Sequence, residues 1–286
     1  MSYLFYFSWF ARGIILQRKC LSIAGFDGSG GAGIQADLKT FTVLGCYGMT
    51  VLTALPIQNT QGVIGCYEIP LGAIEAQLQA IFDDITPDSI KIGMLFKQEI
   101  VTLVANFLAK HASGIPIVLD PVMVAKSGDY LLLPDAIETL KSKLFPLSTI
   151  ITPNLPEAET LIGSHGDIEL LAEQLLQTGA NAVLLKGGHL DGPDSNDLYL
   201  DKKQRLWLHS PRLISNNTHG TGCTLSAACA AYLALDFPLL EACQRAKQFL
   251  FAALKAAQFN PIGKGHGPVD HMHGIYNRQE AGKLNY

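Results

Sequence analysis

The chain lacks several features that would assign it to a well-defined class of protein. Its six cysteines form no CxxC pair and no metal-ligand spacing, so we expect reduced, mostly buried thiols and a cytoplasmic location. The net charge of −4 comes without a basic stripe or a run of lysines, which argues against a partner nucleic acid. No GxxxxGK[ST] motif occurs, which excludes a P-loop nucleotide fold.

The first segment does not fit a signal peptide or a membrane span. The apolar run from Tyr3 to Phe10 is too short to cross a bilayer. Basic residues follow this run, whereas a secretory signal carries them before it. We therefore predict that residues 1–19 form a poorly ordered extension and that the protein has no membrane partner. No repeat, low-complexity tract or linker divides residues 20–286, which we expect to form a single domain.

What the chain does have is a regular alternation of short apolar runs and segments of helical period, with 48% hydrophobic residues. This alternation predicts an α/β fold of three layers, with helices on both faces of a mostly parallel, doubly wound sheet. Active sites in such sheets lie at the carboxyl ends of the strands. We expect strands at 20–25, 47–55, 63–69, 89–93, 116–120, 149–152 and 182–186, a hairpin at 198–200 and 205–208, and helices at 32–44, 71–82, 99–112, 134–144, 168–178, 223–235 and 239–257.

The strongest signal for chemistry is the segment 217–228, in which Gly220 and Gly222 lie in a polar loop that runs directly into an alanine-rich helix. Backbone N–H groups converge at the positive end of such a helix and form a ready site for an anion. A phosphoryl group in transfer spreads its charge over its oxygens, which fixed N–H donors stabilise. We therefore predict a phosphoryl-transfer centre here. The alternative is that the glycines serve only a turn and a helix N-cap.

Cys223 falls in the first turn of this predicted helix. The helix dipole and the nearby N–H groups should favour its thiolate, which would make it a base towards a substrate hydroxyl. The alternative is a small apolar side chain packed beneath the helix, as most cysteines are.

A second glycine-rich loop follows the first predicted strand. Gly28, Gly30 and Gly33 match the spacing of a dinucleotide-binding fingerprint, but no acidic residue follows the second strand to hold a ribose. We therefore prefer a loop whose backbone approaches a flat small molecule, with Asp27 offering a carboxylate. The alternative role for Asp27 is to complement the charge of the following helix N-terminus.

Two further motifs follow strands. Asn154 and Glu157 offer an amide and a carboxylate to a hydrated Mg²⁺, which prefers few protein ligands together with waters and phosphates. Lys186 comes after the next strand, where it would meet a nucleotide phosphate. The alternative is that these side chains are simply solvated.

Many of these motifs occur in the order found in one known family. The segments are 24–37, 58–60, 91–95, 120–123, 125–128, 152–157, 185–189, 217–228 and 263–269. From about Leu21 to His273, the chain resembles the hydroxymethylpyrimidine/phosphomethylpyrimidine kinases of the ThiD type. The resemblance implies a ribokinase-like fold, ATP and Mg²⁺ as cofactors, a homodimer, and two successive phosphorylations of one pyrimidine in thiamine biosynthesis.

The resemblance also implies roles for individual residues. Gln58 would read the aminopyrimidine edge, because an amide offers both a donor and an acceptor. Around it, Asp27, Met94, Val122 and Gly25 would line the substrate pocket. Gly220, Thr221 and Gly222 would form the anion hole, with Cys223 at the position of the base. The metal and ATP phosphates would be served by Glu157, Asp120, Asn154, Lys186 and Lys264, and by Lys126 and Ser127 in a closing flap.

The chain departs from the family at Phe26 and Gly28, where members usually have Thr and Pro. Phe26 is bulkier beside the expected pocket and Gly28 loosens its loop, so we expect altered affinity rather than a different reaction. Two alternatives stay open on this sequence. One is a pyridoxal or pyridoxine kinase of the same fold, and the other is a non-catalytic pyrimidine-binding protein in which Phe26 blocks the pocket.

Overall fold

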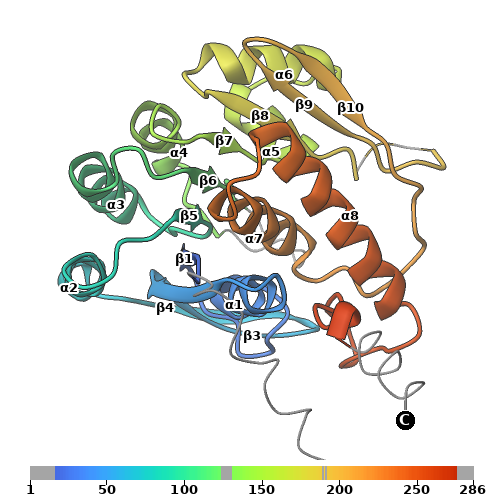
Figure 1. Cartoon of the computed structure of the whole chain (residues 1–286), viewed down its shortest axis with the longest axis horizontal. Helices are drawn as coiled ribbons and strands as arrows, with labels where there is room; N and C mark the ends of the chain where they lie inside the picture. The colour runs from blue at the N-terminus through green and yellow to red at the C-terminus, as the bar shows by residue number, and fades with distance from the viewer. Residues whose placement is uncertain (1–16, 124–130, 189, 191, 276–286) are drawn as a thin grey trace, which may run out of the picture.

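The computed structural model describes residues 17–123, 131–188, 190 and 192–275 (Figure 1). The predicted extension at residues 1–16 therefore lies outside the described residues, as do Lys126 and Ser127 of the predicted flap. That residues 20–286 form a single domain stays a prediction of the sequence.

An eight-stranded sheet lies at the centre of the described residues. Six of its strands are parallel, and two antiparallel strands complete one edge. The prediction of a mostly parallel α/β sheet is confirmed. In spatial order the strands are β2 (Tyr47–Leu52), β1 (Lys19–Ala24), β5 (Ser89–Ile92), β6 (Ile117–Leu119), β7 (Ile150–Ile151), β8 (Ala182–Leu185), β9 (Asp197–Asp201) and β10 (Arg205–Leu208).

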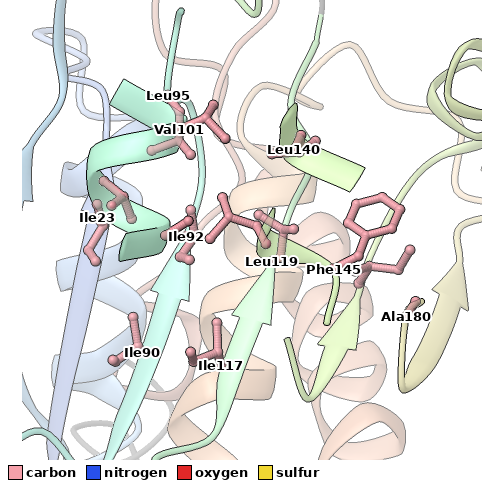
Figure 2. Packing of buried hydrophobic residues seen from close by; sticks show 14 of the residues in the cluster. Ile23, Ile90, Ile92, Leu95, Val101, Ile117, Leu119, Leu140, Phe145 and Ala180 are labelled. Atoms are coloured by element: carbon pink, nitrogen blue, oxygen red, sulfur yellow. The ribbon is translucent and has the colours of Figure 1, made fainter. Parts of the chain in front are cut away.

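Alternate residues of the strands pack into two separate hydrophobic cores, one on each face of the sheet. Leu21, Ile90 and Leu119 point into the first core, whereas Cys20 and Val118 of the same strands point into the second. Figure 2 shows part of the first core, with Ile90 and Ile92 of β5 beside Ile117 and Leu119 of β6. Burial on both faces explains why these strands are continuous apolar runs in the sequence.

Each core is covered by its own layer of helices. The first layer comprises α2 (Leu71–Phe82), α3 (Gln98–His111), α4 (Ala136–Thr139), α5 (Leu155–Ile162) and α6 (Ile168–Gln177). The second layer comprises α1 (Gly33–Val43), α7 (Thr221–Ala234) and α8 (Leu239–Ala257). Figure 1 shows α7 and α8 packed side by side over the sheet. None of the described helices has the length and apolar character needed to cross a membrane.

The predicted strand at 47–55 is wrong in its extent, because the chain leaves the sheet at Thr53. The Thr53 N–H donates to Ala24 O (3.0 Å) and its hydroxyl donates to Met94 O (2.5 Å), which turns the chain out of the plane. It continues as β3 (Ala54–Asn59), which pairs with β4 (Gly62–Glu68) in a separate two-stranded antiparallel sheet. The last two residues of the predicted strand, Ala54 and Leu55, therefore belong to this hairpin, where Ala54 O accepts from the Phe26 N–H just after β1 (3.0 Å).

Two helical segments also differ from expectation. The predicted helix at 134–144 is the short α4 followed by a π-helical segment, η1 (Leu140–Leu144). Helix α5 was not predicted. It begins with a capping box, in which the Asn154 side chain accepts from the Glu157 N–H (2.9 Å) and the Glu157 carboxylate accepts from the Asn154 N–H (2.7 Å). An Asn followed three residues later by Glu is the sequence signal that would have located it.

Candidate active site

A cavity of about 770 Å³ opens at the carboxyl ends of the parallel strands. Its lining includes Phe26 after β1, Met94 after β5, Asp120 after β6, Asn154 after β7 and Lys186 after β8. The doubly wound topology predicts a site in this place. Of the residues named from the sequence, it brings together Gly25, Gln58, Met94, Asp120, Val122, Asn154, Glu157, Lys186, Gly220, Thr221, Gly222 and Cys223.

The amino end of α7 forms one wall of the cavity. Gly220 is its N-cap, with a left-handed φ of +76°, and the chain enters the helix at Thr221. A Cβ atom on Gly222 would lie 3.3 Å from Lys186 Nζ and 3.4 Å from Asp120 Oδ2. The positive end of the helix and a lysine ammonium therefore face the same small volume. That is the electrostatic environment that a transferring phosphoryl group requires.

Asp120, Lys186 and Glu157 form a buried charged cluster opposite this helix. Lys186 Nζ donates to Asp120 Oδ1 (2.9 Å) and lies 3.8 Å from Glu157 Oε2. Burial alone would lower the pKa of the Lys186 ammonium, but the carboxylates of Asp120 and Glu157 raise it above its ordinary value. Lys186 is therefore charged throughout the physiological range, and two acidic side chains hold it in place.

The donor set of this cluster fits Mg²⁺ bound mainly through water and phosphate. Among the described residues, no three His, Cys, Asp or Glu side chains gather into a site that would hold a metal by themselves. Two carboxylates beside one lysine leave a net negative charge, which suits a divalent cation that keeps several of its waters. Asp120 and Glu157 are the residues that would hold it, although the capping box already uses one Glu157 oxygen.

The pKa of the Glu157 carboxyl is raised from 4.5 to about 7 by burial, with a further increase from the charge of Asp120 and an opposing effect of Lys186. Between these two pH values the folded protein binds more protons at Glu157 than the unfolded chain does, so this group lowers stability as the pH rises.

We expect the Glu157→Gln variant, which can still form the capping box, to lose this dependence. Relative to the variant, the wild type should lose up to about 3 kcal/mol of unfolding free energy between pH 4.5 and 7. Urea unfolding at several pH values measures the difference, with the exposed Glu75→Gln in α2 as the control. Parallel pH profiles for the wild type and Glu157→Gln would show that the carboxyl titrates normally.

Cys223 lines the cavity and is half-buried, but its thiol is not activated in the way the sequence suggested. Burial raises its pKa to about 11, with Asp37 and Asp120 adding to the increase and Lys91 opposing it. The prediction that the thiolate is favoured at Cys223 is therefore wrong, because burial, together with the charges of Asp37 and Asp120, outweighs the effects that lower its pKa. At neutral pH the proton stays on sulfur, and any base function works from a small thiolate fraction.

A buried ion pair near Cys223 was missed in the sequence. Lys91 Nζ lies 2.8 Å from Asp37 Oδ2, and both side chains are 0% exposed. The same carboxylate oxygen accepts from the Ser22 hydroxyl (2.5 Å). Lys91 lies between Ile90 and Ile92 in the fully buried strand β5, and a lysine in a buried strand must be paired. A lysine at this position was the sequence signal from which the buried ion pair could have been predicted.

Asp27 does not line the cavity, contrary to the expectation that it would contact the substrate. Its side chain is fully buried and accepts the N–H groups of Ser29 (2.9 Å), Gly31 (3.1 Å) and Ala32 (2.7 Å). It also accepts from the Ser29 hydroxyl (2.7 Å) and pairs with His219 Nε2 (2.7 Å). Although burial alone would raise the pKa of Asp27, the hydrogen bonds with His219 and Ser29 lower it to about 2. The carboxylate thus joins the two glycine-rich loops. Its bonds to N–H groups just before α1 are close to the alternative predicted for Asp27, which was to complement the charge of that helix N-terminus.

The cavity lining also includes Gly25, Phe26, Gln58, Met94 and Val122. Gln58 comes from the β3–β4 hairpin, and its Nε2 donates to the carbonyl of Phe26 (3.3 Å). One amide proton is therefore used inside the protein. An amide oxygen and a second N–H are left as possible partners for a ligand.

The cavity lining also contains residues that the sequence analysis did not identify. Arg212 donates to four backbone carbonyls of the segment 188–194, and Lys247 binds Asp197 Oδ2 (2.6 Å) and Ser195 O (2.6 Å). Phe251 of α8 adds an apolar surface. These residues come from a loop and a long helix with no local motif. Lys264 is exposed and does not line the cavity, whereas its neighbour His266 does.

Comparison with known proteins decides among the families that this geometry allows. A family model described as phosphomethylpyrimidine kinase matches residues 27–270. The chain belongs to the phosphomethylpyrimidine kinase family. Its ribokinase-like fold and its membership of a family of phosphotransferases, both predicted from the sequence, are confirmed.

Individual relatives agree with this assignment. The hydroxymethylpyrimidine/phosphomethylpyrimidine kinase of Salmonella typhimurium is 49% identical over 90% of this chain and 99% of that protein. The thiamine biosynthesis bifunctional protein ThiED of Geobacter sulfurreducens is also 49% identical, over 92% of this chain, which spans only 53% of that longer protein. Among solved structures, an ADP complex of Bacillus subtilis pyridoxal kinase has a TM-score of 0.83 at 37% identity and covers 91% of this chain and 99% of its own.

Proposed function

We propose that this protein transfers the γ-phosphate of ATP to 4-amino-5-hydroxymethyl-2-methylpyrimidine, and then to the resulting monophosphate, in thiamine biosynthesis. The observation that carries the proposal is that one cavity holds an acceptor subsite at Phe26, Gln58 and Met94 and a phosphate subsite at Gly222 and Lys186. The named activity of relatives of equal length supports the choice of acceptor.

Each subsite has a distinct task in this proposal. The amide of Gln58 reads the aminopyrimidine edge, and Cys223 removes the proton of the hydroxymethyl group. The N–H groups at the start of α7 and the ammonium of Lys186 hold the phosphoryl group. Mg²⁺ held by Asp120 and Glu157 would neutralise phosphate charge. The similar structure of Bacillus subtilis pyridoxal kinase with ADP supports a nucleotide in the rest of the cavity. A homodimer remains a prediction from the family resemblance, and a cytoplasmic location remains a prediction from the cysteine pattern.

A coupled ADP-release assay with the hydroxymethylpyrimidine, its monophosphate and pyridoxal tests this function. We expect the highest kcat/KM with the two pyrimidines. Pyridoxal phosphorylation is the second candidate, favoured by the TM-score of 0.83 with a pyridoxal kinase, and preference for pyridoxal would replace the first proposal. Binding of a pyrimidine without ADP release would show a non-catalytic binding protein.

Replacing Gln58 with alanine should raise KM for the pyrimidine about tenfold and leave KM for ATP unchanged, because the lost amide would contact the acceptor ring and no part of the nucleotide. Steady-state kinetics with each substrate varied in turn provide the measurement. Gln61→Ala, an exposed position at the turn of the same hairpin, is the matched control. If both KM values rise together, Gln58 supports the hairpin rather than the substrate.

A further inference from the structure

Phe26 is one of the residues that line the cavity, and the protein fixes the backbone that carries its ring. The Phe26 N–H donates to Ala54 O (3.0 Å), and its carbonyl accepts from Gln58 Nε2 (3.3 Å). The next N–H, of Asp27, donates to Gln35 Oε1 (2.9 Å). Because β3 and α1 both hold this turn, the position of the ring depends mainly on its own side-chain torsions and on its immediate neighbours.

Gly28 is the neighbour that decides whether the ring has room. A Cβ atom at position 28 would lie 3.2 Å from Phe26 Cε1 and 3.8 Å from Cζ. Apart from its own chain neighbours, it would meet nothing else within 4 Å. Gly28 has no positive φ that would demand glycine, and it is exposed. A methyl group here would therefore crowd the aromatic ring two residues earlier, which would have to move by a few tenths of an ångström.

The residues that line the cavity together with Phe26 indicate what kind of molecule it would contact. Gln58, which is bonded to the Phe26 carbonyl, presents hydrogen-bonding groups at the edge of the subsite, whereas Met94 and Val122 present apolar surface. A flat heteroaromatic molecule has this division of surface, with polar atoms at its edge and apolar faces. Aromatic side chains and thioethers both contact such faces favourably.

We propose that Phe26 is a specificity-determining residue of the acceptor subsite, whose ring packs on the acceptor's heteroaromatic ring, and that Gly28 is required to keep it in place. The ligand class is a planar, hydroxymethyl-bearing heteroaromatic compound. This inference rests on the proposed function, since it assigns a determinant to the same acceptor subsite. It also opposes the alternative in which Phe26 blocks the pocket.

A double-mutant cycle tests the inference. Phe26→Ala should raise KM for the pyrimidine about tenfold or more and leave KM for ATP unchanged. Gly28→Ala should raise the pyrimidine KM several-fold while Phe26 is present, because its methyl group displaces the ring, and should have no further effect in the Phe26→Ala background. Phe26→Tyr should keep the wild-type KM. Gly72→Ala in α2, whose new methyl group would meet nothing within 4 Å, is the control.

Other outcomes would overturn the inference. A lower pyrimidine KM in Phe26→Ala would show that the ring obstructs the pocket. Additive effects of the two substitutions would show that Gly28 does not act through Phe26. Calorimetric titration of the pyrimidine into the wild type and Phe26→Ala separates this inference from the proposed function. If the wild type binds the pyrimidine without turnover, the proposed function fails, and tenfold weaker binding by Phe26→Ala still supports the role of the ring.

Discussion

Replacing Cys223 with alanine should lower kcat about 100-fold or more, because it removes the only group we assign as base to the acceptor hydroxyl. KM for both substrates should change little, since the thiol has no binding role in the proposed function. The wild-type kcat should also rise with pH between about 7 and 9, because the thiolate fraction grows tenfold per pH unit below a pKa of about 11. Steady-state kinetics at several pH values measure both effects.

The control for this experiment is Cys66→Ala, at a half-buried position in β4 that does not line the cavity. Cys66→Ala should retain the wild-type kcat and its pH dependence. A Cys223→Ala enzyme with a nearly normal rate would show that the thiol only fills space beneath α7. A reduced rate with an unchanged pH dependence would assign the base to another residue.

Replacing Gly220 with alanine should lower kcat/KM about 100-fold to 1000-fold and destabilise the protein by about 2 kcal/mol or more. A Cβ atom at this position would lie 1.7 Å from Gly31 O, a distance that no side-chain rotation can relieve. The left-handed φ of +76° adds backbone strain. The two loops must therefore separate, which displaces the N–H groups at the start of α7. Kinetics and urea unfolding provide the two measurements.

Gly114→Ala separates the collision from the strain. Gly114 has nearly the same φ, +79°, but a Cβ atom there would meet nothing within 4 Å. This control should show only the cost of the left-handed conformation, about 1 kcal/mol, and normal kinetics. Equal behaviour of the two variants would mean that the contact between Gly31 and Gly220 does not position the anion site.

The elements predicted best from the sequence are those whose boundaries depend on local chemistry. Helices α2 and α8 match their predicted ranges, because each follows a proline and has a clear apolar period. The path after β2 was not predictable in the same way. Residues 47–55 have continuous β propensity. The bend at Thr53 depends on hydrogen bonds to Ala24, at the end of β1, and to Met94, just after β5, and both residues are distant from Thr53 in the sequence.

In the candidate site, too, features that depend on local sequence could be predicted, and features that depend on distant residues could not. Residues in compact motifs, such as Gly220, Gly222 and Lys186, could be named from the sequence and do line the cavity. The protonation state of Cys223 could not be predicted, because it depends on burial and on the charges of Asp37, Asp120 and Lys91, which lie in three other segments of the chain. Arg212 and Lys247 were missed because their contacts join segments that carry no shared pattern.

The hydrogen bond between Asp27 and His219 has a consequence for engineering this enzyme. It joins the glycine-rich loop after β1 to the residue immediately before Gly220, so a change in the conformation of one loop will affect the other. A redesign that lengthens or changes residues 26–33 to admit a new compound should also shift the N–H groups at the start of α7, to which we assign phosphate binding. Libraries aimed at new acceptors should therefore hold Asp27, Gly31 and His219 constant and vary Phe26 and Gly28 as a pair.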